Sequence, residues 1–305
     1  MVNPQFAAVD WGTSSFRLWL IGAGDVILGE SRSGEGMTTA RETGFAAVLE
    51  HHLHTVGAAA DLPVIVCGMA GAKQGWREAG YIDVPAKLST IADKAVRVEG
   101  IERDVRILPG LAQRDPQAAD VIRGEETQLL GCSQSMKRSD CLVAMPGTHS
   151  KWVRIVRDEA LGFATFMTGE LFDAISKHTI LSHSLKDSAG FDGADPAFTN
   201  AVYSAYREPQ LSTNRLFSVR ARGLLFSMTN VEAEATLSGT MIGLELAGAL
   251  HSAPKDTPVI LVVSGKLRGL YEAALHRVGR NFSTIDADEA VRQGLTQSAR
   301  AIWQF

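Results

Sequence analysis

The chain has 305 residues, of which 45% are hydrophobic and 21% are charged, and its formal net charge at pH 7 is −4. These values are ordinary for a globular protein with a large buried core, and the length favours two domains. The net charge argues against a nucleic-acid or anionic-membrane surface, and no apolar run approaches the ~20 residues of a membrane span. Because the N-terminus lacks a signal-peptide pattern, we expect a cytoplasmic protein. Three cysteines without Cys-x-x-Cys spacing are predicted to be buried free thiols: Cys67, Cys132 and Cys141.

The first motif is a turn of small residues between two apolar segments, 6–9 and 17–21, which predict two strands. Consecutive backbone N–H groups in such a turn form an anion-binding concavity. Asp10, at the end of the first strand, can hold a divalent cation, usually through water. A hairpin capped by Asp10 is the alternative for these residues taken alone. The candidate phosphate-binding residues here are Gly12, Thr13, Ser14 and Arg17.

The next segments predict a third strand at 26–28 and a helix over 43–56 with Thr43 as its N-cap. We interpret the helix histidines, His51, His52 and His54, as solvated. A strand over 63–67 then enters a loop with three glycines, and ligands bind at such strand ends in open α/β sheets. A purely structural loop is the alternative to a sugar-binding one. The candidate sugar-binding residues are Gly34, Gly71, Lys73 and Trp76.

A further strand is predicted at 105–109. The segment 120–131 then turns into a helix at Gly124 and the acidic pair Glu125 and Glu126. Acidic residues are common in first helical turns because they offset the positive end of the helix dipole, so a structural role is the simplest one. Neighbouring residues of a helix lie about 100° apart, so only one of the two is expected to face a site.

The second half repeats the opening of the first. After a polar linker over 133–140, the predicted strands 141–145, 152–156 and 161–167 flank a turn in which Gly147 lies 135 residues after Gly12. Gly169 lies 135 residues after Gly34, and a constant offset at two separated sites indicates an internal duplication. Met145 stands where Asp10 would repeat, so we expect the first half to handle the metal. The candidate phosphate-binding residues of this turn are Gly147, Thr148, His149, Ser150 and Lys151.

The remaining pattern predicts a helix over 169–182, a loop over 182–195 and helices from 197 to 250 with a break near Asn230. A strong strand over 257–263 then enters a small-residue turn and a helix at 267–278. A strand at 283–286 and a helix at 289–303 end the chain.

The paired turns resemble the phosphate motifs of the actin-like ATPase and sugar kinase superfamily, whose first motif reads Asp-x-Gly-Thr-Thr/Ser-Ser-x-Arg in glycerol kinase-like members. The resemblance implies an α/β fold of two duplicated actin-like (ribonuclease H-like) domains with a nucleotide cleft between them. We place the domains at 1–133, with the first phosphate motif and the sugar-acid site, and at 134–305, with the second phosphate motif and the adenosine site. The turn after strand 257–263 resembles the adenosine motif of the superfamily and implies an adenosine site at Ser264, Gly265 and Lys266.

The acidic pair gains a role from the same resemblance. Gly124 to Glu126 resembles the Gly-Asp-Gln segment of glycerol and xylulose kinases, where the Asp is the catalytic base, and also the Glu-Glu pair of the exopolyphosphatase branch. Glu125 or Glu126 is therefore the implied base, and we favour Glu125 because it comes first after the glycine. Asp10 is the implied metal ligand and the third catalytic candidate.

Five blocks in order resemble the 2-dehydro-3-deoxygalactonokinase family, which implies ATP- and Mg²⁺-dependent phosphorylation of 2-dehydro-3-deoxy-D-galactonate at its 6-hydroxyl, in galactonate catabolism. The alternatives are a phosphohydrolase of the exopolyphosphatase type and a non-enzymatic actin-like nucleotide switch. The expected partners are the sugar acid and ATP, without nucleic acid or membrane, and a homodimer is one possible assembly. The blocks are Asp10 to Ser14, Gly68 to Gly71, Arg123 to Gln128, Pro146 to Trp152 and Thr168 to Phe172.

Overall fold

The structure is a computed structural model that describes residues 3–136 and 140–304, and the chain forms two compact units. The first unit comprises Met1–Ser139, Ile155–Gly162 and Asp286–Phe305, and the second comprises Asp140–Arg154 and Phe163–Ile285. We expected a single division at 133/134. Instead, two later segments, Ile155–Gly162 and Asp286–Phe305, also belong to the first unit, so this unit is discontinuous in sequence. The short helix Ser133–Met136 occupies the start of the expected linker, and residues 137–139 lie outside the described residues.

The first unit is built on a six-stranded sheet with the order β3-β2-β1-β4-β8-β7. Strands β1, β2 and β3 form an antiparallel meander, whereas β4 and β8 continue the sheet parallel to β1. A second, three-stranded sheet has the order β10-β9-β5. The strands are β1 Pro4–Trp11, β2 Phe16–Gly22, β3 Ile27–Ser33, β4 Val64–Gly68, β5 Tyr81–Asp83, β6 Ala86–Lys87, β7 Val96–Arg97, β8 Val105–Ile107, β9 Gly110–Gln113 and β10 Asp120–Ile122.

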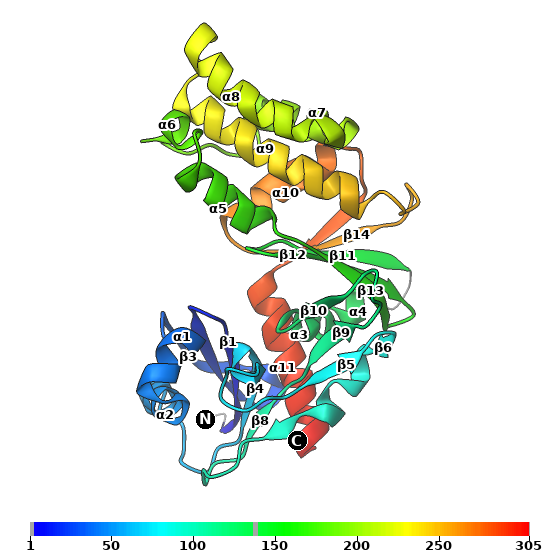
Figure 1. Cartoon of the computed structure of the whole chain (residues 1–305). Coiled ribbons are helices and arrows are strands. Elements are labelled where there is room, and N and C mark those ends of the chain that lie inside the picture. Colours follow the sequence, from blue (N-terminus) through cyan, green and yellow to red (C-terminus); the bar gives the residue numbers. More distant parts are fainter. Residues whose placement is uncertain (1–2, 137–139, 305) are drawn as a thin grey trace. The chain divides into compact units, whose positions relative to one another are not determined.

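Helices cover this sheet (Figure 1), and the core between them contains Phe16, Val66 and Ile107 from the strands and Leu49 from α2. The last helix, α11, packs closely against α3 inside this unit: a Cβ on Gly294 would lie 1.9 Å from the carbonyl oxygen of Thr127. The helices are α1 Met37–Thr43, α2 Phe45–Thr55, α3 Glu125–Gly131, α4 Ser133–Met136 and α11 Ala287–Trp303.

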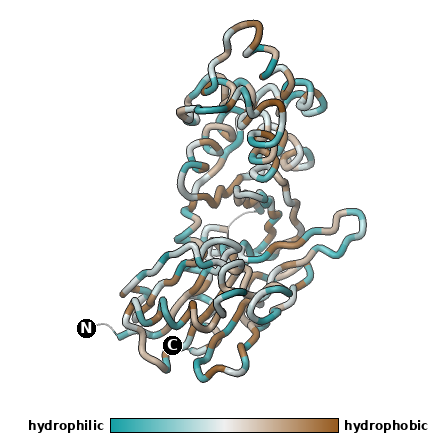
Figure 2. The backbone as a smooth tube through the Cα atoms, turned by 60° about the vertical axis from the view of Figure 1, so that its left-hand side comes forward, coloured by the Kyte–Doolittle hydropathy of each residue, from teal (hydrophilic) through white to brown (hydrophobic). Residues whose placement is uncertain are grey.

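The second unit is built on strands β15-β14-β11-β12-β13, in that order, with β14 parallel to both β11 and β15. The far end of the β12–β13 hairpin belongs to the first unit, where Glu159 and Ala160 pair with β6. Figure 2 shows apolar segments along the strands of each unit. The strands are β11 Cys141–Met145, β12 Ser150–Val156, β13 Glu159–Phe166, β14 Val259–Val262 and β15 Phe282–Ile285.

A layer of helices follows β13 in the second unit, and α7, α8 and α9 lie together in Figure 1. Helix α9 begins where the sequence predicted a break: Thr229 caps it and Glu232 completes a capping box. Its buried face joins two apolar clusters, one with Phe198 and Tyr271 and one with Leu181 and Val219. The helices are α5 Thr168–His178, α6 Ser182–Leu185, α7 Pro196–Arg207, α8 Ser212–Phe226, α9 Asn230–Ala249 and α10 Lys266–Arg277. Among the described residues, no helix combines the length and apolar character needed to cross a membrane.

The strand orders confirm the duplication that the sequence predicted. Each unit has three consecutive strands at one side of its sheet and continues with strands parallel to the first. The glycine correspondence needs one correction, because the first-unit glycine that packs on the turn is Gly36 and not Gly34. A Cβ on Gly36 would lie 2.4 Å from the Thr13 oxygen, and one on Gly169 would lie 2.6 Å from the Gly147 oxygen. A Cβ on Gly34 would meet only the Ser14 oxygen within 4 Å, at 4.0 Å.

Three local predictions were wrong. The helix predicted over 43–56 is present as α2, Phe45–Thr55, but its N-cap is Gly44, at φ 94°, and not Thr43, which is the last residue of α1. His52 is buried rather than solvated: its ring stacks on Phe16 at 4.4 Å, and its Nε2 lies 2.9 Å from Glu35 Oε2. The predicted loop over 182–195 contains α6. The three cysteines are buried and free, as expected.

Candidate active site

In the first unit, two parallel strands and one helix bring the acidic candidates together. Asp10 and Cys67 are register partners near the ends of β1 and β4, and the Cys67 thiol donates to Asp10 Oδ1 at 3.8 Å. A Cβ on Gly124, at the start of α3, would lie 3.5 Å from the Cα of Gly68. Since ligands bind at the carboxyl ends of strands in open α/β sheets, this is where the topology predicts a site.

Asp10 lies in a partly buried network of charges. Arg17, opposite it on β2, has its Nη1 3.7 Å from Asp10 Oδ2 and 2.5 Å from Asp288 Oδ1. Arg32 also reaches Asp288, at 2.8 Å. Burial raises the pKa of Asp10; Arg17 opposes this effect, while the charges of Asp288 and Glu125 add to it. The carboxylate therefore attracts positive charge more strongly than a solvated one, because little water screens it.

The two glutamates of α3 have different environments. Glu126 is fully buried and accepts hydrogen bonds from the backbone N–H of Gly124 at 2.7 Å and from the Thr127 hydroxyl at 2.9 Å. Burial, with the nearby charge of Glu125, raises the pKa of Glu126 to about 8, so its neutral form dominates at pH 7. Glu125 is only partly buried, and its Oε2 accepts from the Arg123 N–H at 3.0 Å. Of the pair, Glu125 is the one that a ligand can reach.

The first turn presents exposed side chains on a fixed backbone. Thr13 and Ser14 are exposed, and the Gly12 N–H donates to the Ser15 oxygen at 2.9 Å. The start of α1 is hydrogen-bonded to the turn, because the Met37 N–H donates to the Gly12 oxygen. These positions agree with the predicted anion-binding turn, while phosphate binding itself stays a prediction.

The predicted sugar-acid residues differ in burial and surroundings. Trp76 packs in an aromatic group, stacked on Phe45 at 5.9 Å and edge-on to Trp11 at 6.0 Å, so its main role is in the core. Lys73 is exposed, and Gly34 lies on the exit from β3. Gly71 is buried, and a Cβ there would lie 2.8 Å from Nη1 of Arg123, a residue the sequence did not single out.

The second turn divides its predicted phosphate ligands into two sets. Thr148 and His149 are exposed, and His149 Nε2 lies 2.5 Å from Glu170 Oε2. Ser150 is fully buried with its hydroxyl 3.1 Å from that of Tyr271, and Lys151 is buried with its Nζ donating to the His149 oxygen. Side-chain contact from Ser150 or Lys151 to a phosphate is therefore not supported, because both already serve the turn.

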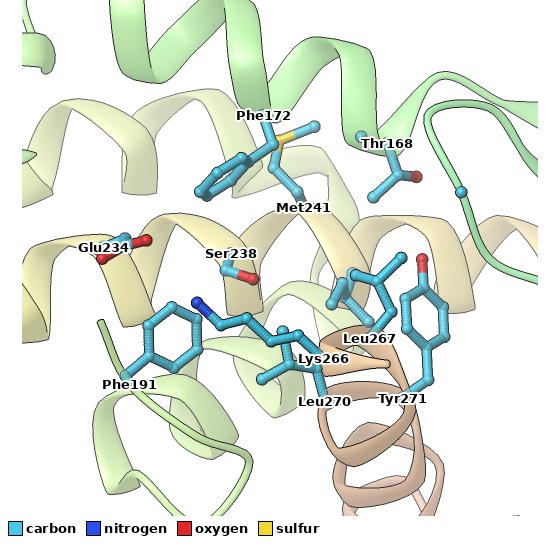
Figure 3. A pocket seen from close by; sticks show the side chains of 13 residues that line it. Thr168, Phe172, Phe191, Glu234, Ser238, Met241, Lys266, Leu267, Leu270 and Tyr271 are labelled. Carbon is cyan, nitrogen blue, oxygen red and sulfur yellow. The ribbon is translucent and has the colours of Figure 1, made fainter. Parts of the chain in front are cut away.

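A pocket in the second unit opens beside this turn (Figure 3), and it includes Gly147 and Lys266 from the predicted phosphate and adenosine sets. Ser264 and Gly265 are not among its lining residues; Gly265, at φ 65°, precedes α10. Most of the lining is apolar, with Ser238 and Glu234 as polar groups at one side. The Lys266 Nζ lies 5.6 Å from the centre of the Phe191 ring. The other lining residues are Thr168, Gly169, Phe172, Met241, Ile242, Leu267, Leu270 and Tyr271.

A buried glutamate under this pocket was missed from the sequence. Glu245, on α9, is 1% exposed; it accepts from the Trp152 indole at 2.8 Å and from the Tyr271 hydroxyl at 2.7 Å. Burial raises its pKa, and hydrogen bonds from Thr168, Trp152, Tyr271 and Ser150 oppose that effect. The network ties the phosphate turn to the helices that line the pocket. A glutamate within an apolar helical pattern was the available signal.

Comparisons with known proteins agree with this architecture. The family model described as 2-keto-3-deoxy-galactonokinase matches residues 10–298. A relative from Rhizobium meliloti (strain 1021), named a probable 2-dehydro-3-deoxygalactonokinase, is 57% identical over 298 residues, covering 98% of this chain and 97% of its own. The 2-dehydro-3-deoxygalactonokinase of Escherichia coli (strain K12) is 31% identical over 301 residues, covering 99% of each chain.

Solved structures extend the comparison to the fold. A crystal structure of a Sinorhizobium meliloti protein assigned to the same activity has a TM-score of 0.96 at 57% identity, covering 98% of this chain and 100% of that one. The activator of 2-hydroxyisocaproyl-CoA dehydratase from Clostridium difficile, with bound ADPNP, has a TM-score of 0.50 at 12% identity, covering 98% of this chain and 96% of that one, and shares the fold alone. With its two duplicated α/β units, the chain is a sugar kinase of the actin-like ATPase fold, and it belongs to the 2-keto-3-deoxy-galactonokinase family.

Proposed function

We propose that this enzyme transfers the γ-phosphoryl group of ATP to the 6-hydroxyl of 2-dehydro-3-deoxy-D-galactonate, forming ADP and the 6-phosphorylated sugar acid, in galactonate catabolism. The observation that carries the proposal is the match to the 2-keto-3-deoxy-galactonokinase family over residues 10–298. The relatives named for this substrate cover nearly the whole chain, which supports the same acceptor here.

We propose the second-unit pocket as the adenosine site. Phe172 and Phe191 offer aromatic faces for the base, and the side chains of Ser238 and Glu234 offer polar groups for its edge (Figure 3). Gly147 belongs to both the pocket and the phosphate turn, so a nucleotide seated in the pocket has its phosphates near the exposed Thr148 and His149. Within the first unit taken by itself, Thr13 and Ser14 are the proposed phosphate-binding residues, because both are exposed on the turn after β1.

We propose Glu125 as the general base. Its carboxylate accepts the proton of the acceptor hydroxyl while the hydroxyl oxygen bonds to the γ-phosphorus and the bond from that phosphorus to the β–γ bridging oxygen breaks. The partial exposure of Glu125 supports this role, and the complete burial of Glu126 argues against a direct part for that residue. Arg17, between Asp10 and Asp288, is placed to offset charge on a phosphate.

Asp10 is the proposed Mg²⁺ ligand. The described residues contain no group of three or more His, Cys, Asp or Glu side chains arranged to hold a metal ion. Magnesium in kinases is held by one or two carboxylates together with substrate phosphates and water, so a site built on Asp10 needs no larger cluster of carboxylates. Asp10, with Asp288 close enough to influence its ionisation, is the fitting donor set. When bound, Mg²⁺ neutralises phosphate charge.

A coupled ADP-release assay tests the function. We expect ATP-dependent ADP release with 2-dehydro-3-deoxy-D-galactonate and slower release with its C4 epimer, because differences in binding geometry of the acceptor change the rate steeply. Phosphate release from ATP or polyphosphate in the absence of any sugar acid would favour the phosphohydrolase alternative. Nucleotide binding without turnover of any sugar acid would favour the nucleotide switch. ATP use supports a cytoplasmic location, and the homodimer stays a prediction.

A further inference from the structure

Arg123 has an unusual environment in the first unit. It lies between the end of β10 and Gly124, two residues before the proposed base. Its guanidinium stacks over the Tyr81 ring, 4.4 Å from the ring centre, and its Nη2 donates to the Gly80 oxygen at 2.8 Å. The guanidinium is thus fixed by a carbonyl and an aromatic face, and neither of these neutralises its charge.

Two donors of this guanidinium have no partner. Nε and Nη1 of Arg123 are both buried and have no hydrogen-bond partner among the described residues. A buried charged group without compensation is strongly unfavourable, and most buried polar groups in native proteins are paired. An orphaned guanidinium therefore indicates a ligand that supplies the missing acceptors, and a carboxylate is the group that matches its geometry best.

The lack of a side chain at Gly71 keeps Nη1 of Arg123 from being blocked by a neighbour. Gly71 lies beside Nη1: a Cβ there would be 2.8 Å from that nitrogen, so any other residue would crowd the guanidinium. Tyr81, which stacks over one face of the guanidinium, is 38% exposed, so a ligand that approaches from this face reaches the donors only if the Tyr81 side chain moves. Gly71 belongs to the loop after β4 that the sequence predicted to bind the sugar acid, whereas Arg123 was found from its unpaired donors alone.

We infer that Arg123 binds the carboxylate of the sugar-acid substrate and makes the enzyme specific for acids over neutral sugars. The inference rests on the proposed function. A six-carbon sugar acid carries its carboxylate at one end and the reacting 6-hydroxyl at the other. The segment from Arg123 to Glu125 offers one group for each end, a guanidinium for the carboxylate and a carboxylate for the hydroxyl proton, and the Arg123 N–H fixes Glu125 through a 3.0 Å hydrogen bond.

The test compares Arg123→Gln and Arg123→Lys with wild type on two acceptors, the sugar acid and its neutral carboxamide. We expect Arg123→Gln to raise KM for the acid about 10- to 100-fold, the range of one charge-assisted hydrogen bond, and to leave KM for ATP unchanged. The preference for acid over carboxamide should collapse in Arg123→Gln and be partly retained in Arg123→Lys, which keeps the charge. Melting temperatures of all variants separate a binding defect from unfolding.

Arg77→Gln is the matched control, because it removes the same charge from an exposed arginine that follows the same loop. An active wild type whose acid-to-carboxamide preference is unchanged in Arg123→Gln would overturn the inference and leave the proposed function intact. A wild type that phosphorylates no sugar acid would overturn both. A variant that loses turnover of acid and carboxamide equally, at normal melting temperature, would assign Arg123 to positioning Glu125 and would also overturn the inference.

Discussion

The two hairpin turns of this enzyme share a strand arrangement and differ in chemistry. In the first, Asp10 and Arg17 flank the turn, and Arg17 pairs with the carboxylate of Asp288. At the same offset in the second stand Met145 and Trp152, both nearly fully buried, and the Trp152 indole donates to the buried Glu245. Arg17 and Trp152, which occupy the duplicated position, each contact a carboxylate, Asp288 and Glu245 respectively. Only Asp288, in the first unit, is partly exposed, whereas Glu245 is buried.

The difference shows how the two units of a duplicated fold can take different chemical roles. A partly buried charge pair can respond to a metal or a phosphate, whereas a buried indole–carboxylate hydrogen bond fixes the backbone and leaves nothing free to react. The second unit uses that rigidity beside an apolar pocket, and the first unit keeps its charges available near Glu125. We therefore expect substitutions of Asp10 and Glu125 in the first unit to change kcat, and substitutions at the pocket of the second unit to change nucleotide binding.

The largest expected effect comes from the acidic pair. Glu125→Gln should lower kcat by about 10²- to 10⁴-fold, the range for a lost general base. Glu126→Gln should leave kcat close to wild type, because Glu126 is fully buried. Steady-state kinetics with both variants side by side check this. If both keep near-normal kcat, neither is the base and Asp10 becomes the leading candidate.

Asp10→Asn should lower kcat by about 10²- to 10³-fold, since a neutral amide cannot offset the charge of a cation in this preorganised site. Turnover measured across a Mg²⁺ titration should show the larger defect at low Mg²⁺. Met145→Leu, the conservative change at the duplicated position, is the control and should leave the Mg²⁺ dependence unchanged. Unchanged turnover of Asp10→Asn at low Mg²⁺ would show that Asp10 is only a turn cap.

A smaller effect is expected at the second-unit pocket. Lys266→Ala should raise KM for ATP about threefold to tenfold with kcat and the sugar-acid KM retained, because the exposed lysine contributes a charge that solvent partly screens. Arg268→Ala removes a charge from the same helix outside the pocket lining and should change neither constant. Equal effects of the two variants would place the nucleotide elsewhere.

The last effect is on stability rather than on turnover, and it is a change in the pH dependence of stability. The pKa of Glu126 is raised from 4.5 to about 8 by burial, so between these values the folded state holds a proton that the unfolded state has released. This contribution to the free energy of unfolding is fully present below pH 4.5 and is lost as the pH rises toward about 8. Glu126→Gln should therefore flatten the fall of Tm with pH over this range. Exposed Glu42→Gln is the control, and an unchanged slope in Glu126→Gln would contradict the raised pKa.

The sequence was sufficient for features that depend on local pattern. The strand–turn–strand repeat, the start of α9 near Asn230 and the burial of the cysteines all follow from apolar periodicity and turn residues. The short strands β5, β6 and β7 carry too little pattern to be found that way. His52 was misjudged because its neighbours His51 and His54 are exposed, and only the fold brings Glu35 to its ring.

The residues of the candidate site were predictable where a local sequence motif contains them. They were not predictable where they come from a segment that is distant in sequence. Asp10 and Glu125 follow strand ends and glycines, which are local signals. Asp288 lies in the first turn of a late helix, where an acidic residue is expected to serve the helix dipole, so nothing local connects it to Arg17. For Ser150 a local motif predicted too much: its position in the second turn predicted a phosphate ligand, but its hydroxyl is buried against that of Tyr271.

The return of α11 to the first unit also has a consequence for biosynthesis. Because Gly294 approaches the Thr127 backbone closely and Asp288 completes the charge network of Arg17, the first unit cannot finish its tertiary structure while residues 287–303 are still inside the ribosome. Domains usually fold in order of synthesis. Here the segments of the second unit all emerge before α11, so it can assemble first, and the part of the enzyme that begins the chain reaches its native state last.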